Sequence, residues 1–190
     1  MIKSLIGLGI LATAIAIPGP KEVTTKSKPI EISVTPYKFW ECYSCTPEER
    51  YVLQKLQEHT HISDRNALAS IMGNIKQESR FKSNICEGGA RVSYENCHRG
   101  GYGLIQWTSK NRYIGLGMFA KKYGCNPSTL ECQTRYMINE RQFQKVLPEF
   151  EGPGQSISQY MHPAYRWLGW GIKGNREVYS YNYSRKLTQA

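Results

Sequence analysis

The fold of this chain is decided by Ile71-Met72-Gly73-Asn74-Ile75-Lys76-Gln77-Glu78-Ser79-Arg80-Phe81, which predicts a central amphipathic helix. Apolar residues recur at three- and four-residue steps through and just before this stretch, as on one face of a helix: Leu68, Ile71, Met72 and Ile75. Glu78 follows Ile71 by two helical turns and therefore falls at the border of the apolar face. We expect its carboxyl group to lie half against the core.

A glycine-rich stretch follows about twenty residues later: Gly100-Gly101-Tyr102-Gly103-Leu104-Ile105-Gln106-Trp107. Its glycines remove side chains, so that a polymer can approach the backbone closely. Gln106 and Trp107 add an amide and an aromatic face. The two stretches together predict an acid that faces a groove.

The acid is Glu78, whose predicted position suits general acid catalysis on a glycosidic bond. A carboxyl group that gives a proton to a glycosidic oxygen near neutral pH must be partly desolvated, because burial raises its pKa. The competing interpretation is a buried glutamate that only accepts hydrogen bonds in the core. An arginine that kept Glu78 ionised, or burial without an accessible channel, would exclude the catalytic role.

At these residues the chain resembles the lysozyme superfamily, and within it the phage tail lysozyme family, which is related to goose-type lysozymes and lytic transglycosylases. The resemblance rests on Gly-Asn-Ile-x-x-Glu-Ser-x-Phe at residues 73–81, on Gly-Gly-Tyr-Gly-Leu-x-Gln-Trp at residues 100–107, and on Arg112 at the start of the next helix. It extends over roughly residues 46–185 and is weak beyond residue 145.

The resemblance implies roles for individual residues. Glu78 matches the catalytic acid of the family. Ser79, which follows it, matches a residue that steadies the groove or contacts substrate. The positions that line the groove correspond to Tyr102, Gly103, Gln106 and Trp107.

A second catalytic carboxylate is not decided by the sequence. Retaining glycosidases place it about 5 Å from the acid, and inverting ones about 6.5–9.5 Å away. Glu87 and Glu95 lie on the connection that faces the predicted groove and are the two candidates, although glutamates on loops are usually solvated. If neither approaches Glu78, the chain is closer to a lytic transglycosylase, in which one acid also serves as the base.

The sequence divides into three segments. Residues 1–17 are a hydrophobic segment that resembles a signal peptide, an uncleaved anchor with membrane contact, or a segment buried in a larger assembly. Residues 18–41 are rich in Pro, Lys and Thr and predict a linker, within which residues 30–34 alternate like a strand that could add to a partner's sheet. Residues 42–190 form the predicted catalytic domain.

Six cysteines fall in sequence-local pairs: Cys42 and Cys45, Cys86 and Cys97, Cys125 and Cys132. After an export-like start we expect disulfides, whose connectivity the sequence alone does not fix. A zinc site built on Cys42 and Cys45 is the alternative, but no second closely spaced ligand pair completes it. We therefore predict no metal site.

The net charge of +10 predicts attraction to polyanions such as those of bacterial envelopes. The basic residues are scattered and accompany no recognised nucleic-acid motif, so no nucleic-acid partner is expected. Much of the charge is explained equally well by solubility.

The predicted architecture is α+β and mainly helical, with a small antiparallel hairpin region near residues 88–106. Capping boxes predict helices from Thr46 to about His59 and from Ser128 to about Val146. Ser63 or Asp64 caps the central helix, and another helix runs from about Ser109 to Tyr123 before Gly124. His162-Pro163 predicts a helix boundary within an aromatic-rich tail of closing helices, whose rings serve mostly for packing and in part for sugar stacking.

Together with these patterns, the resemblance implies an enzyme that cleaves the β-1,4 bond between N-acetylmuramic acid and N-acetylglucosamine in peptidoglycan without a cofactor. The resemblance implies a virion tail component, assembled with other tail proteins, that opens the host wall locally in the periplasm for DNA entry. A secreted or membrane-released lysozyme acting at lysis or in wall remodelling is one alternative. A catalytically inactive structural or glycan-binding tail protein is the other.

Overall fold

The computed structural model describes residues 39–190, and the predictions for residues 1–17, 18–38 and 30–34 lie outside the described residues. Seven α-helices occur in the described part: α1 Pro47–His59, α2 Arg65–Ser79, α3 Lys110–Tyr123, α4 Leu130–Asn139, α5 Arg141–Glu151, α6 Ile157–Leu168 and α7 Arg176–Lys186. None of these helices has the length and apolar character needed to cross a membrane.

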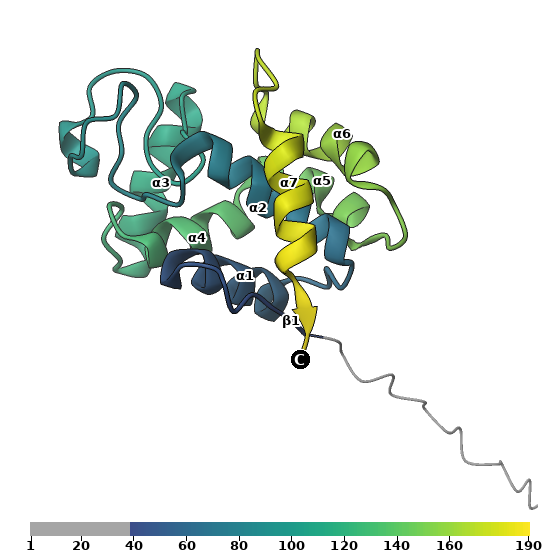
Figure 1. Cartoon of the computed structure of the whole chain (residues 1–190). Coiled ribbons are helices and arrows are strands. Elements are labelled where there is room, and N and C mark those ends of the chain that lie inside the picture. The colour runs from purple at the N-terminus through teal and green to yellow at the C-terminus, as the bar shows by residue number, and fades with distance from the viewer. Residues whose placement is uncertain (1–38) are drawn as a thin grey trace, which may run out of the picture. The chain divides into compact units, whose positions relative to one another are not determined.

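A two-stranded antiparallel sheet joins the two ends of the described chain (Figure 1). Strand β1 (Trp40–Glu41) pairs with β2 (Thr188–Gln189), with Trp40 opposite Gln189. The mainly helical α+β class is therefore confirmed, but the sheet does not lie in the predicted hairpin region. There, Cys86 and Tyr102 form an isolated antiparallel bridge, as do Ile85 and Arg91. Strand β1 lies at the end of the predicted linker 18–41, directly before residue 42, the predicted start of the domain.

Two predicted helix starts are confirmed by their caps, and the predicted helix before Gly124 is confirmed as well. The Thr46 hydroxyl accepts from the Glu49 backbone N–H, and the Glu49 carboxylate accepts from the Thr46 N–H, which completes the capping box of α1. The Asp64 carboxylate caps α2. Helix α3 follows Ser109 and ends at Gly124, which adopts the left-handed conformation that glycine tolerates best.

The predicted single helix to about Val146 is wrong. Thr129, rather than Ser128, is the N-cap, and the helix divides at Glu140, whose extended backbone ends α4 and precedes α5. The break turns the Glu140 side chain into the core, where it accepts three side-chain donors described below. A tertiary hydrogen-bond network therefore overrides local helix propensity here.

The predicted helix boundary at His162-Pro163 is also wrong, because Pro163 lies inside α6. Proline cannot donate the backbone hydrogen bond of a helix interior. Pro163 is nevertheless buried, with Tyr160, Ala164 and Trp167 on the same helix. Packing of this apolar face retains the helical path.

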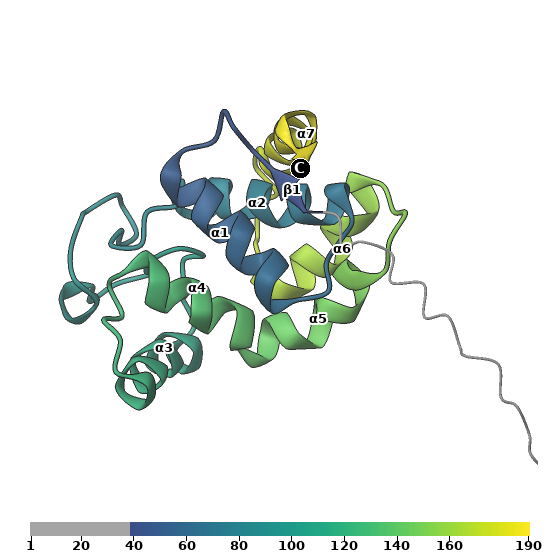
Figure 2. The ribbon, with the colours of Figure 1, turned by 90° about the horizontal axis from the view of Figure 1, so that it is seen from below.

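Helix α2 is the centre of the fold, and α7 packs against it more extensively than any other element (Figures 1 and 2). Helices α1 and α6 also contact α2. The closest approach of α7 occurs at Gly73, where a Cβ atom would lie 2.5 Å from the backbone nitrogen of Ser180. Because only glycine fits there, Gly73 fixes where α7 crosses α2. One turn before Ser180, α7 begins at Arg176, beside Glu78 of α2.

Three disulfides join the cysteines in the sequence-local pairs: Cys42–Cys45, Cys86–Cys97 and Cys125–Cys132. All six cysteines of the chain are therefore oxidised, and no thiolate remains for the zinc site considered above. The Cys86–Cys97 bond closes the connection between α2 and the glycine-rich stretch.

We predict that Gly73→Ala destabilises the protein strongly, because the added methyl group meets the Ser180 backbone and not a flexible side chain. Overpacking of this kind costs about 1–3 kcal/mol or more. Gly152→Ala is the matched control, since its Cβ would lie 3.6 Å from its nearest neighbour and its φ is negative. Denaturant unfolding of both variants measures the difference; equal midpoints would contradict the close crossing.

Candidate active site

Glu78 lies in the last turn of α2 and faces an open cavity of about 690 Å3. Its side chain is only 14% exposed. The walls come from the turn before α3, the start of α3, the loop between α6 and α7, and the start of α7. The lining residues are Glu78, Ile105, Gln106, Thr108, Ser109, Arg112, Leu168, Gly169, Trp170, Gly171, Ile172 and Arg176.

Opposing effects act on the Glu78 carboxyl. Burial raises its pKa and is the largest effect, whereas a hydrogen bond from the Arg176 guanidinium and the charges of Arg176 and Arg112 lower it. The net result is a pKa raised above 4.5, the ordinary value. Glu78 is thus accessible through the cavity, and the arginine beside it does not offset the effect of burial. This is the combination that a general acid requires.

The backbone on both sides of the cavity adopts unusual conformations. Arg80 and Phe81, which end α2, and Gln106, in the facing turn, all have positive φ angles of 51–64°. Such conformations are costly for residues other than glycine and concentrate at functional sites. Arg80 and Phe81 follow Ser79, the last residue of α2, and Gln106 itself lines the cavity.

Ser79 fastens the facing turn to α2. Its buried hydroxyl donates to the Leu104 carbonyl at 2.7 Å. The Leu104 N–H in turn donates to the Gln133 amide oxygen at 2.7 Å. Of the two roles that the resemblance implied for Ser79, this geometry fits the one that steadies the groove.

Packing against Gln133 leaves no room for a side chain at Gly103. Its φ is +74°, and a Cβ atom would lie 2.4 Å from the Gln133 amide oxygen. The neighbouring Gln106 side chain donates to the Gly103 carbonyl at 3.0 Å and lines the cavity. Of the predicted groove residues, Gln106 is the one whose side chain the structure brings to Glu78's cavity.

Tyr102 and Trp107 do not line the cavity, which corrects the prediction that they form the groove surface. Both side chains are fully buried. The Tyr102 ring packs against Tyr94 and Tyr113, and the Trp107 indole donates to Glu140 at 3.2 Å. The large apolar area of each ring favours burial, so both rings anchor the turn to the core.

Glu140 joins this turn to the cavity wall. Its buried carboxylate accepts from the Trp107 indole, from the Trp167 indole at 3.0 Å, and from two nitrogens of Arg112 at 2.5 and 3.0 Å. A bidentate pair holds the guanidinium plane in one orientation. Arg112 is thereby fixed in the cavity wall, with its charge balanced by Glu140.

Arg176 forms the opposite wall. Its guanidinium donates to Glu78 and to the carbonyls of Ile172 and Lys173 at 2.9 and 2.8 Å, so it also ties down the loop before α7. The Trp170 ring lies over this guanidinium, 4.7 Å from its carbon. A cation placed over an indole in this way stabilises both side chains.

Neither candidate for a second catalytic carboxylate lines the cavity. The Glu87 carboxylate accepts from the Gly101 N–H at 2.9 Å and so fastens the glycine-rich stretch. Glu95 is exposed in the short 3-10 helix Tyr94–Asn96. Among the described residues that line the cavity, Glu78 is the sole carboxylate.

A comparison with family models decides the family of this chain. The model of the phage tail lysozyme family matches residues 48–166, which include Glu78, the facing turn and Arg112. The chain belongs to the phage tail lysozyme family. A search of curated proteins gave no match, and a search of solved structures gave none either. Family membership gives the chain a lysozyme-like, peptidoglycan-degrading role.

Two residues of this cavity, Arg176 and Trp170, were not predicted as site residues. Both lie beyond residue 166, where the family match ends. Trp170 belongs to the aromatic-rich tail, whose rings were predicted to serve mostly for packing and in part for sugar stacking. Its neighbour Gly169 ends α6 in the left-handed conformation, and a glycine at this position is a local signal for the end of a helix. Nothing in the sequence near Arg176 signals its contact with Glu78, 98 positions earlier.

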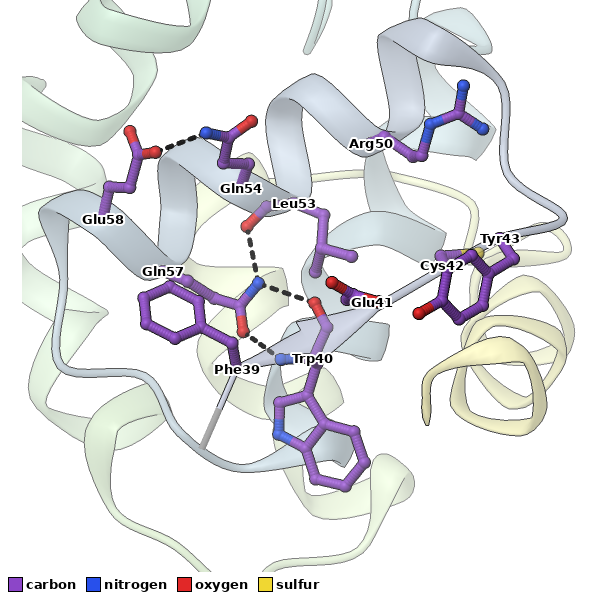
Figure 3. A pocket seen from close by; sticks show the side chains of 10 residues that line it. All are labelled: Phe39, Trp40, Glu41, Cys42, Tyr43, Arg50, Leu53, Gln54, Gln57 and Glu58. Atoms are coloured by element: carbon purple, nitrogen blue, oxygen red, sulfur yellow. Dashed lines mark hydrogen bonds between the residues drawn. The ribbon is translucent and has the colours of Figure 1, made fainter. Parts of the chain in front are cut away.

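A second cavity of about 540 Å3 lies between β1 and α1 and shares no lining residue with the first (Figure 3). Figure 3 shows the Gln57 amide bridging both backbone polar groups of Trp40, at 2.6 and 3.0 Å. The amide thus pairs with the outer edge of β1 as a further strand would. We assign this region to the anchoring of β1.

Proposed function

We propose that this lysozyme cleaves the glycosidic bond between N-acetylmuramic acid and N-acetylglucosamine, with Glu78 as the general acid. The observation that carries the proposal is one half-buried carboxyl group with a raised pKa at the wall of an open cavity. Glu78 donates its proton to the bridging oxygen as the bond to the sugar C1 breaks. Gln106 and Trp170 offer an amide and a ring edge to the sugars on either side.

The lone carboxylate favours the lytic transglycosylase outcome over hydrolysis. After the first step Glu78 is ionised and close to the new positive charge at C1. It then accepts the proton of the muramyl C6 hydroxyl while the C6 oxygen bonds to C1. The product is a 1,6-anhydro sugar, no water is consumed, and Glu78 regains its proton. A hydrolase would need a second group to activate water, and neither Glu87 nor Glu95 lines this cavity.

The biological setting that we propose is the tail of a phage particle, in which the enzyme opens the host wall locally as DNA enters. The family description supports this setting. The net charge of +10 supports it too, because the anionic polymers of a bacterial envelope attract a basic protein.

We predict that Glu78→Gln abolishes the clearing of purified cell walls in a zymogram, with a loss of about 100-fold or more, the usual contribution of a general acid. Glu95→Gln is the matched control and should keep wild-type activity. Wild-type activity should fall as pH rises through the raised pKa of Glu78, because the acid is lost on ionisation. A folded wild type that clears no wall would instead favour a structural or glycan-binding role.

We also predict that mass spectrometry of the released fragments finds 1,6-anhydromuramyl ends, lighter than reducing ends by one water. Digestion in water enriched in oxygen-18 is the control: transglycosylation leaves the new ends unlabelled. Labelled reducing ends throughout the digest would show hydrolysis and would require a second catalytic group.

A further inference from the structure

The Arg176 guanidinium is buried with an incomplete set of partners. Its side chain is only 7% exposed although it lines the cavity. Two carbonyl groups and Glu78 accept from its terminal nitrogens, but its Nε atom has no hydrogen-bond partner among the described residues. A buried donor without a partner is costly.

The charges around the cavity leave Arg176 dependent on Glu78. The lining holds two arginines and, within the described chain, one carboxylate. Arg112 has its own counter-ion in Glu140. Lys173, next to the cavity, is paired with Glu177, and Lys76 of α2 is paired with Glu49. Glu78 is therefore the counter-ion of Arg176.

This dependence opposes the neutral form of Glu78 that general acid catalysis requires, although burial outweighs it. A glutamate that donates a proton must first be neutral, whereas a guanidinium stays charged in proteins. When Glu78 takes up its proton, Arg176 is left as a buried cation without a counter-ion, which is strongly unfavourable. When Glu78 is protonated, the site can therefore bind one further anion at Arg176.

We propose that Arg176 binds a carboxylate of the muramyl substrate and exchanges Glu78 for it when the glycan enters the cavity. This inference rests on the function proposed above. Muramyl residues carry a lactyl carboxyl group, free in peptide-free glycan, and stem peptides carry carboxyl groups of their own. Either one supplies the planar, two-oxygen partner that a guanidinium binds best.

The exchange couples binding to catalysis. Once the Arg176 guanidinium has exchanged Glu78 for the substrate carboxylate, Arg112 of α3 is the remaining charged neighbour of Glu78. Arg112 itself stays bound to Glu140. The pKa-lowering effect of Arg176 is then removed, so the pKa of Glu78 rises further and Glu78 takes up a proton. By linkage, carboxylate binding and protonation of Glu78 favour each other. Arg176 is therefore a positioning residue: by binding the substrate carboxylate, it allows Glu78 to take up the proton that it donates in catalysis.

Calorimetric titration near neutral pH, in two buffers of different ionisation enthalpy, tests the exchange. The probes are the N-acetylglucosamine–N-acetylmuramic acid disaccharide with a free lactyl carboxyl group, its methyl ester, and the disaccharide bearing a dipeptide. We expect wild type to take up about one proton per free-acid disaccharide bound and none with the ester. Uptake with the dipeptide form alone assigns the carboxylate to the stem peptide and supports the proposal equally.

Variants separate the exchange from general attraction between charges. Glu78→Gln removes the competing carboxylate, so it should bind the free acid about tenfold more tightly and without proton uptake. Arg176→Gln should bind acid and ester equally. Lys173→Gln, which removes an exposed cation from the same loop, should behave as wild type. If Arg176→Gln does not melt cooperatively and is therefore not folded, the exchange is tested with Arg176→Lys and Glu78→Gln instead.

The exchange would be overturned by absence of proton uptake in wild type with both the free-acid disaccharide and the dipeptide form, or by proton uptake that persists in Arg176→Gln. Absence of binding by all three probes would also overturn it. The function proposed above is judged separately, since wall clearing by wild type and its loss in Glu78→Gln do not depend on these titrations.

Discussion

The structure depends on the balance between burial of the Glu78 carboxyl and its contact with the Arg176 guanidinium. Both side chains lie where they do because α7 crosses α2 at Gly73, which has no side chain to hold the helices apart. Burial raises the pKa of Glu78, and the contact lowers it by less. At a site of this kind, a change in the neighbouring charges shifts the acid between its ionised and protonated forms.

The rest of the cavity is held by buried polar groups beneath it. Glu140 accepts hydrogen bonds from Trp107 of the facing turn and from Trp167 of α6, and so connects the two. The same carboxylate fixes Arg112. Ser79 fastens the same turn to α2. These groups touch the cavity wall and not the open space, so they preorganise the site in the way that electrostatic catalysis needs. Arg176 differs from them, because its counter-ion is the acid itself.

The sequence predicted the elements whose signals are local. Caps gave the starts of α1 and α2 and the end of α3, cysteine spacing suggested the disulfide pairs, and helical periodicity placed Glu78 at the edge of the core. It failed where tertiary contacts override local signals: Glu140 splits a predicted helix, and Pro163 continues one. The aromatic residues Tyr102 and Trp107 were predicted in the groove but belong to the core. Arg176 reaches the site from the far end of the chain, and no pattern within one sequence records such a contact.

A carbon-13 NMR titration of the Glu78 side-chain carboxyl, assigned by comparison with Glu78→Gln, tests the central claim most directly. The balance described here predicts a midpoint above 4.5, the ordinary value for a glutamate, and a further rise in Arg176→Gln. A midpoint at or below 4.5 in the wild type would show that Arg176 keeps the group ionised, and would contradict its role as the general acid.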